Sequence, residues 1–106
     1  MTLRAINNIR DSHFQGGTKA DQTKGLFLPS VTNKTLSQIY DAGLSDASAW
    51  KLNSSGYYEK TFPYANVGLR SEKCGNSLPS TQVTIVVERY GANGYNEVVT
   101  MYPADK

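Results

Sequence analysis

The sequence predicts an α+β fold, in which an N-terminal helix and short helices pack on a small antiparallel sheet that ends in a β-hairpin. Two observations predict this class. Apolar residues recur at helical spacing in the first half of the chain, whereas β-branched residues alternate near its end. A chain of 106 residues can bury one hydrophobic core but not two. Residues 1–106 are therefore expected to form a single globular domain.

The first helix is expected from Leu3 to about Phe14, with Thr2 as its N-cap. Gly16-Gly17 ends this helix. A polar loop then leads to a short buried anchor, Gly25-Leu26-Phe27-Leu28-Pro29. The apolar side of the helix is expected to comprise Leu3, Ile6, Ile9 and either His13 or Phe14.

A second helix is expected after Thr32 or Asn33, and Gly43 stands where a left-handed residue would follow its end. Ser45 can cap a further helical turn from Asp46 to Trp50, and Trp50 should anchor the core. The apolar face of the second helix is expected to comprise Leu36, Ile39 and Tyr40.

A β-hairpin closes the chain, because two β-rich runs, 81–87 and 98–102, flank a glycine-containing turn. A tight turn on Asn93-Gly94 avoids the like-charge pair of Glu88 and Glu97 that a longer loop would create, so the tight turn is expected. In either register, the core face is expected to carry Val83, Ile85, Val87, Val98 and Tyr102. The opposite face then carries Thr84, Val86, Glu88, Tyr90, Glu97, Val99 and Met101.

Short strands are also expected between Tyr57 and Leu69, interrupted by Pro63, ahead of the hairpin. This segment holds an aromatic cluster formed by Tyr57, Tyr58, Phe62 and Tyr64. Because Lys51 and Lys60 lie nearby in the sequence, the cluster is a candidate interface whose rings could stack on bases or sugars. Packing of the same rings in the core and at its rim is the alternative.

The composition narrows the classes of partner. A net charge of +2 is too small to indicate nucleic acid or a membrane as a partner, and no apolar run is long enough to span a bilayer. Abundant Gly, Ser, Thr and Asn with few charged residues are typical of loop-rich domains that work outside the cytoplasm. An extracellular or cell-surface location is therefore expected.

The sequence predicts no catalytic residue, no cofactor and no metal site. Cys74 is the single cysteine, so it has no intrachain disulfide partner, and no functional role is expected for it. His13 is the single histidine, and it could form an acid–base site with Glu59, Glu72 or Arg70. No spacing supports that arrangement, so a non-enzymatic protein is expected.

The order of elements resembles the globular head of a bacterial type IV pilin, especially of the type IVb and minor-pilin group. Ile6-Asn7-Asn8-Ile9-Arg10 to Gly16 looks like the end of the family's long helix, and the segment 36–45 is similar to its short helix with a glycine and serine continuation. The hydrophobic half-helix and the C-terminal disulfide of that family have no counterpart in these residues. The resemblance implies a structural or adhesive subunit of a surface filament, with other filament subunits, copies of itself or a surface receptor as partners.

Two alternatives remain beside the filament subunit. One is a small secreted nuclease or toxin domain built around His13 and a carboxylate of the sheet. The other is a small protein- or ligand-binding module that uses the aromatic cluster.

Overall fold

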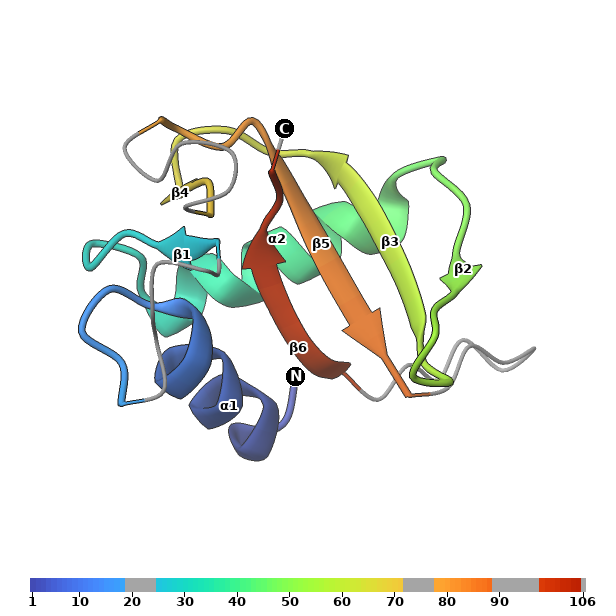
Figure 1. Cartoon of the computed structure of the whole chain (residues 1–106), viewed down its shortest axis with the longest axis horizontal. Coiled ribbons are helices and arrows are strands. Elements are labelled where there is room, and N and C mark those ends of the chain that lie inside the picture. Colours follow the sequence, from blue (N-terminus) through green and yellow to red (C-terminus); the bar gives the residue numbers. More distant parts are fainter. Residues whose placement is uncertain (19–24, 72–77, 89–97, 106) are drawn as a thin grey trace.

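The computed structural model describes residues 1–18, 25–71, 78–88 and 98–105 (Figure 1). It confirms the predicted α+β class with an N-terminal helix. The elements follow in the order α1 (Leu3–His13), β1 (Leu26–Phe27), α2 (Asn33–Ser45), β2 (Lys51–Leu52), β3 (Tyr58–Pro63), β4 (Gly68–Leu69), β5 (Gln82–Val87) and β6 (Val98–Pro103). No helix within the described ranges is long and apolar enough to cross a membrane.

The larger sheet has the strand order β2-β3-β5-β6, and all neighbouring strands are antiparallel. α2 crosses one face of this sheet, whereas α1 lies beside the edge strand β6 (Figure 1). The side-chain amide of Asn8 on α1 donates to the backbone carbonyl of Val99 at 2.7 Å, so α1 occupies part of the open edge. β1 and β4 form a separate two-stranded antiparallel sheet.

Both helices begin at the caps that the sequence predicts. The hydroxyl of Thr2 accepts from the backbone N–H of Ala5 at 3.1 Å, and that of Thr32 accepts from Thr35 at the same distance. The expected apolar side of α1 is partly wrong. Ile9 is buried as expected, but Leu3 is 70% exposed, and the buried Ala5 was not expected on this side.

The hydrophobic core lies between the larger sheet and α2 and continues to α1 and β1. Val83, Ile85 and Val87 of β5 are fully buried, as expected. Val98 and Trp50 pack against this core while remaining partly exposed. The fully buried apolar side chains of the core cluster include Ile9, Phe27, Leu36, Ile39, Val83, Ile85, Val87 and Met101.

Gly43 lies inside α2 and not after its end, so the predicted left-handed position is wrong. A Cβ atom on Gly43 would lie 2.7 Å from Cε1 of Phe62, which is closer than packed carbon atoms approach. Its role is therefore to let α2 approach the sheet. The further helical turn predicted from Asp46 to Trp50 is also absent, and Asp46 instead accepts from the backbone N–H of Ser48 at 2.8 Å.

Lys60 is a charged side chain on the core face of β3, where it is only 3% exposed. Its ammonium group donates to the backbone carbonyl of Asp46, the residue that follows α2. The same group lies 5.6 Å from the ring centroid of Trp50. Because the C-terminal end of a helix carries partial negative charge, this position compensates the burial of the ammonium group.

A β-bulge overturns the expected register of the hairpin. Val87 pairs with Val98, but its neighbour Val86 pairs with Thr100, so Val99 is an extra residue in β6. The tight-turn register would have paired Val87 with Thr100 and is therefore wrong. The turn itself, within residues 89–97, lies outside the described residues.

The bulge also exchanges the two faces of β6. Met101 pairs with Ile85 and is fully buried, although the alternation predicts it on the opposite face. Tyr102 pairs with Thr84 and lies on the face away from α2, so its predicted core position is wrong. A one-residue insertion shifts the side-chain alternation by one position, which accounts for both corrections. It also presents the Tyr102 ring to α1.

Candidate functional site

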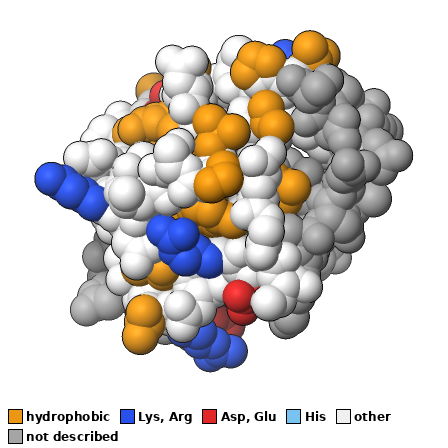
Figure 2. Space-filling view, turned by 90° about the vertical axis from the view of Figure 1, so that its left-hand side faces the viewer, with side chains coloured by type: hydrophobic (Ala, Val, Ile, Leu, Met, Phe, Trp, Pro, Cys, Tyr) orange, Lys and Arg blue, Asp and Glu red, His pale blue; other side chains and the backbone are white. Residues whose placement is uncertain are grey.

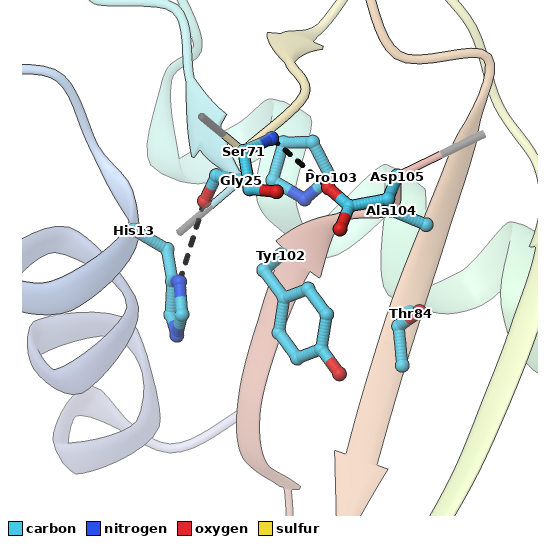
Figure 3. Close-up of a pocket in the computed structure, with 8 residues that line it drawn as sticks. All are labelled: His13, Gly25, Ser71, Thr84, Tyr102, Pro103, Ala104 and Asp105. Atoms are coloured by element: carbon cyan, nitrogen blue, oxygen red, sulfur yellow. Dashed lines mark hydrogen bonds between the residues drawn. The ribbon is translucent and has the colours of Figure 1, made fainter. Parts of the chain in front are cut away.

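A pocket of about 370 Å³ lies where the end of α1 meets the end of β6 (Figure 3). Segments that are far apart in the sequence supply its wall, because α1, β5, β6 and the regions beside β1 and β4 converge there. The lining residues are His13, Gly25, Ser71, Thr84, Tyr102, Pro103, Ala104 and Asp105.

Gly25 sets how closely these segments approach. A Cβ atom on Gly25 would lie 3.0 Å from the carbonyl carbon of Pro103 and 3.6 Å from the carbonyl oxygen of Leu69. Any larger residue would therefore push the start of β1 away from the end of β6. The glycine keeps the pocket walls together.

His13 is the last residue of α1, and its half-buried ring lies beside the ring of Tyr102 with 5.1 Å between the centroids (Figure 3). Its Nδ1 atom lies 3.4 Å from the backbone carbonyl oxygen of Gly25. A carbonyl oxygen can only accept, so the neutral imidazole carries its proton on Nδ1. Nε2 is then the nitrogen that can take up a further proton, as a general base requires.

Tyr102 belongs to a row of hydroxyl groups across the outer face of the sheet. Thr84 lies between Tyr102 and Thr61 in the strand pairing, and the hydroxyls of Thr61 and Thr84 are 2.8 Å apart. Burial raises the pKa of Tyr102, and the negative charge of Glu59 raises it further, whereas a hydrogen bond with the Thr84 side chain lowers it. At neutral pH the Tyr102 hydroxyl is therefore protonated and can act as a hydrogen-bond donor.

The raised pKa of Tyr102 predicts how stability changes at high pH. The folded chain holds a proton that the unfolded chain releases near the ordinary tyrosine value of 10.0. The contribution of Tyr102 is therefore complete below pH 10.0 and is lost as the pH rises through the higher folded-state pKa. Urea unfolding from neutral pH to about pH 11 should show a smaller alkaline loss of stability in Tyr102→Phe than in Tyr64→Phe. Equal losses in the two variants would contradict the assignment.

Ser71 is a second polar group of the pocket, and it is only 4% exposed. Its backbone N–H donates to Oδ1 of the exposed Asp105 at 2.9 Å (Figure 3). Its hydroxyl has no hydrogen-bond partner among the described residues. A buried hydroxyl without a partner costs about 1–3 kcal/mol of stability, so this group is one that a bound molecule would complete.

The structure separates the partners that the sequence suggests for His13. Glu59 lies on the same sheet face as Tyr102, but its carboxylate accepts from the side chain of Asn53 at 3.3 Å and does not line the pocket. Arg70 precedes Ser71, and its Nε atom has no hydrogen-bond partner within the described ranges. Glu72 lies outside the described residues, as does Cys74. Among the described residues, Asp105 is the carboxylate that lines the pocket.

Sequence reasoning missed Ser71 and Asp105 and placed Tyr102 in the core. No periodicity marks Ser71 or Asp105, since both lie outside the strands. Tyr102 could be found only by recognising the bulge. One signal was available, because the single histidine falls at the end of a predicted helix.

The aromatic cluster does not form one exposed surface. Phe62 is 1% exposed and belongs to the core. Tyr58 and Tyr64 pack partly against that core, with the Tyr64 ring edge-on to Phe62 at 6.4 Å. Tyr57 is half-buried beside the turn at Asn53. The candidate interface therefore cannot use Phe62 unless the core opens.

The surface around α1 has mixed character. On the face seen in Figure 2, apolar side chains lie among polar ones, and Lys and Arg are more visible than Asp and Glu. Four large apolar residues are exposed within the described part of the chain, namely Leu3, Leu44, Leu52 and Leu78. No group of three His, Cys, Asp or Glu residues in that part could hold a metal ion.

No protein-family model, no curated protein and no solved structure matches this chain.

Proposed function

We propose that this chain is a small ribonuclease, of the secreted nuclease or toxin kind, that cleaves single-stranded RNA at the His13 pocket. The observation that supports the proposal is the placement of the single histidine. Its ring lies in the wall of a pocket, its Nδ1 faces a carbonyl oxygen, and the ring of Tyr102, whose hydroxyl is protonated at neutral pH, lies beside it. A histidine, a carboxylate and a tyrosine with a perturbed pKa that line one pocket form a candidate acid–base site.

RNA suits this pocket because RNA supplies its own nucleophile, the ribose 2′-hydroxyl. In the proposed reaction, Nε2 of His13 takes the proton of that hydroxyl, and the 2′ oxygen attacks the adjacent phosphorus. The bond from phosphorus to the 5′ oxygen breaks, and the leaving oxygen takes a proton from water. The protonated His13 then returns its proton to the hydroxide that this water leaves. The products are a 2′,3′-cyclic phosphate and a 5′-hydroxyl. Tyr102 supplies a hydrogen bond to a phosphate oxygen, where negative charge builds up in the transition state.

This proposal departs from the expectation that nucleic acid is not a partner. That expectation rests on the net charge of +2. Strong binding to a long duplex depends on many contacts between basic side chains and phosphates, so a small net charge argues against it. The same small charge is a weaker argument against cleavage of short single strands. Single-stranded RNA is bound largely by stacking and by contacts to base edges, and these need few positive charges. The proposed location remains outside the cell or at its surface.

The test compares a single-stranded RNA oligonucleotide with DNA of the same sequence and with a fully 2′-O-methylated RNA. We expect the purified chain to cleave the RNA alone, because only RNA offers a free 2′-hydroxyl. Cleavage of all three strands at similar rates, or of none of them, would contradict the proposal.

A subunit of a surface filament is the second proposal, and the exposed Leu3 favours it. This side chain is 70% exposed near the start of α1, so it could be buried against another subunit. The measurement is the molar mass in solution over a range of concentrations, with Leu3→Ser as the variant. Concentration-dependent association that Leu3→Ser abolishes, without any RNA turnover, would make the filament subunit the better account.

A further inference from the structure

We infer that the His13 pocket selects guanine, with Asp105 and Ser71 as the groups that recognise the base. The inference rests on the proposed ribonuclease function and names the nucleotide at which cleavage occurs.

The hydroxyl of Ser71 is a polar group in the pocket wall that the described residues leave unsatisfied. This side chain lines the pocket, is 4% exposed, and has no hydrogen-bond partner in the described part of the chain. Buried polar groups in folded proteins are nearly always hydrogen-bonded. A polar atom of a bound ligand could supply the hydrogen bond that this hydroxyl lacks. A hydroxyl can donate to a carbonyl oxygen, such as the O6 atom of guanine.

The carboxylate of Asp105 is hydrogen-bonded to the backbone of Ser71. The backbone N–H of Ser71 donates to Oδ1 of Asp105 at 2.9 Å, which holds the carboxylate close to Ser71. A carboxylate has about four acceptor positions on its two oxygens, so it can accept from a ligand in addition to this backbone group. A ligand edge that engages both oxygens of Asp105 together with the Ser71 hydroxyl therefore needs two adjacent donors followed by an acceptor.

Guanine is the base whose Watson–Crick edge has that combination. Its N1–H and N2–H groups are adjacent donors, which suit the two oxygens of a carboxylate, and O6 follows as an acceptor. Adenine and cytosine each place a ring-nitrogen acceptor beside their amino donor. Uracil has one N–H between two carbonyl oxygens, which a carboxylate would repel.

The remaining walls suit a flat base. Tyr102 offers an aromatic ring, and Pro103 and Ala104 offer buried apolar surface. Single-stranded RNA is commonly read by stacking of an unpaired base on an aromatic side chain together with hydrogen bonds to its Watson–Crick edge. The volume of about 370 Å³ lies within the usual range of sites for small molecules.

The test measures binding of the four ribonucleoside monophosphates by calorimetry and maps the cleavage positions in an RNA that contains all four bases. We expect guanosine monophosphate to bind about tenfold or more tightly than the others, and cleavage to follow guanosine. Asp105→Asn keeps one oxygen for the Ser71 N–H but loses the charge and an acceptor, so it should lose most of this preference. Ser71→Ala should weaken guanosine monophosphate binding severalfold without lowering the melting temperature, since the hydroxyl it removes has no partner in the described residues.

The matched control is Asp41→Asn, which makes the same change at an exposed position of α2 and should leave the preference intact. Equal binding of the four nucleotides, or a preference that survives both Asp105→Asn and Ser71→Ala, would overturn the guanine assignment. RNA cleavage without base preference would overturn this inference and leave the ribonuclease proposal standing. Selective binding of guanosine monophosphate without RNA turnover would support guanine recognition, overturn the ribonuclease proposal and indicate a binding module.

Discussion

Replacing His13 by alanine is expected to lower the rate of RNA cleavage by roughly 10²–10⁴-fold, the usual contribution of a positioned general base. The reason is that Nδ1 faces the carbonyl of Gly25 and carries the proton of the neutral ring, so Nε2 is the nitrogen that accepts the proton of the 2′-hydroxyl. The fold should survive, because His13 is half-buried and lies at the end of a helix. The measurement is the initial cleavage rate of the RNA oligonucleotide, with the melting temperature recorded for each variant.

His13→Asn is the matched variant for this prediction. The asparagine amide can still donate to the Gly25 carbonyl, but it cannot take up a proton at neutral pH. The His13→Asn variant should therefore retain more of the native packing than His13→Ala, but it should cleave RNA as slowly. Turnover near the native rate in either variant would exclude His13 as the base, and a matching fall in melting temperature would show that the loss is structural.

Val87→Asp should unfold the domain. Val87 is fully buried on the core face of β5 between Tyr58 and Val98, so the new carboxylate would be removed from water. The ammonium group of Lys60 on this face already donates to the carbonyl of Asp46. Losses above about 4 kcal/mol are typical of a charge placed in a core, and small domains have only about 5–15 kcal/mol of stability. The measurement is the thermal and urea unfolding of the variant, followed by circular dichroism.

Leu52→Asp is the control for this core substitution. Leu52 of β2 is 64% exposed, so the same type of change should alter stability by only about 0.5 kcal/mol. If Val87→Asp melted close to the native temperature, the packing of α2 on this face of the sheet would be wrong.

The sequence predicts the local parts of this fold well. Thr2 and Thr32 cap the two helices, and the alternation of Val83, Ile85 and Val87 identifies the core face of β5. These features depend on hydrogen bonds within one helical turn or on the period of a single strand, so neighbouring residues are sufficient to reveal them.

The errors arise where distant contacts decide the outcome. The bulge at Val99 depends on how β6 pairs with β5, so the alternation within β6 predicted the wrong face for Met101 and Tyr102. Gly43 has the residue type that commonly ends a helix, but its close packing against Phe62 explains its presence inside α2.

The candidate site was hidden for the same reason. Pairing of Leu26 with Leu69 brings the start of β1 beside β4, and this carries Ser71 toward the end of β6. No local pattern in the sequence reports that pairing, because strands of two residues give almost no periodic signal. Of the pocket residues, the sequence singled out only His13 as a candidate for chemistry.

The most direct test of the proposed mechanism is the chemical identity of the first product formed in isotopically labelled water. If His13 activates the 2′-hydroxyl of the substrate, mass spectrometry will find a 2′,3′-cyclic phosphate that contains no labelled oxygen, together with a 5′-hydroxyl end. A first product that carries labelled oxygen on its phosphate, or that ends in a 5′-phosphate, would show that water attacks the phosphorus and would contradict the account.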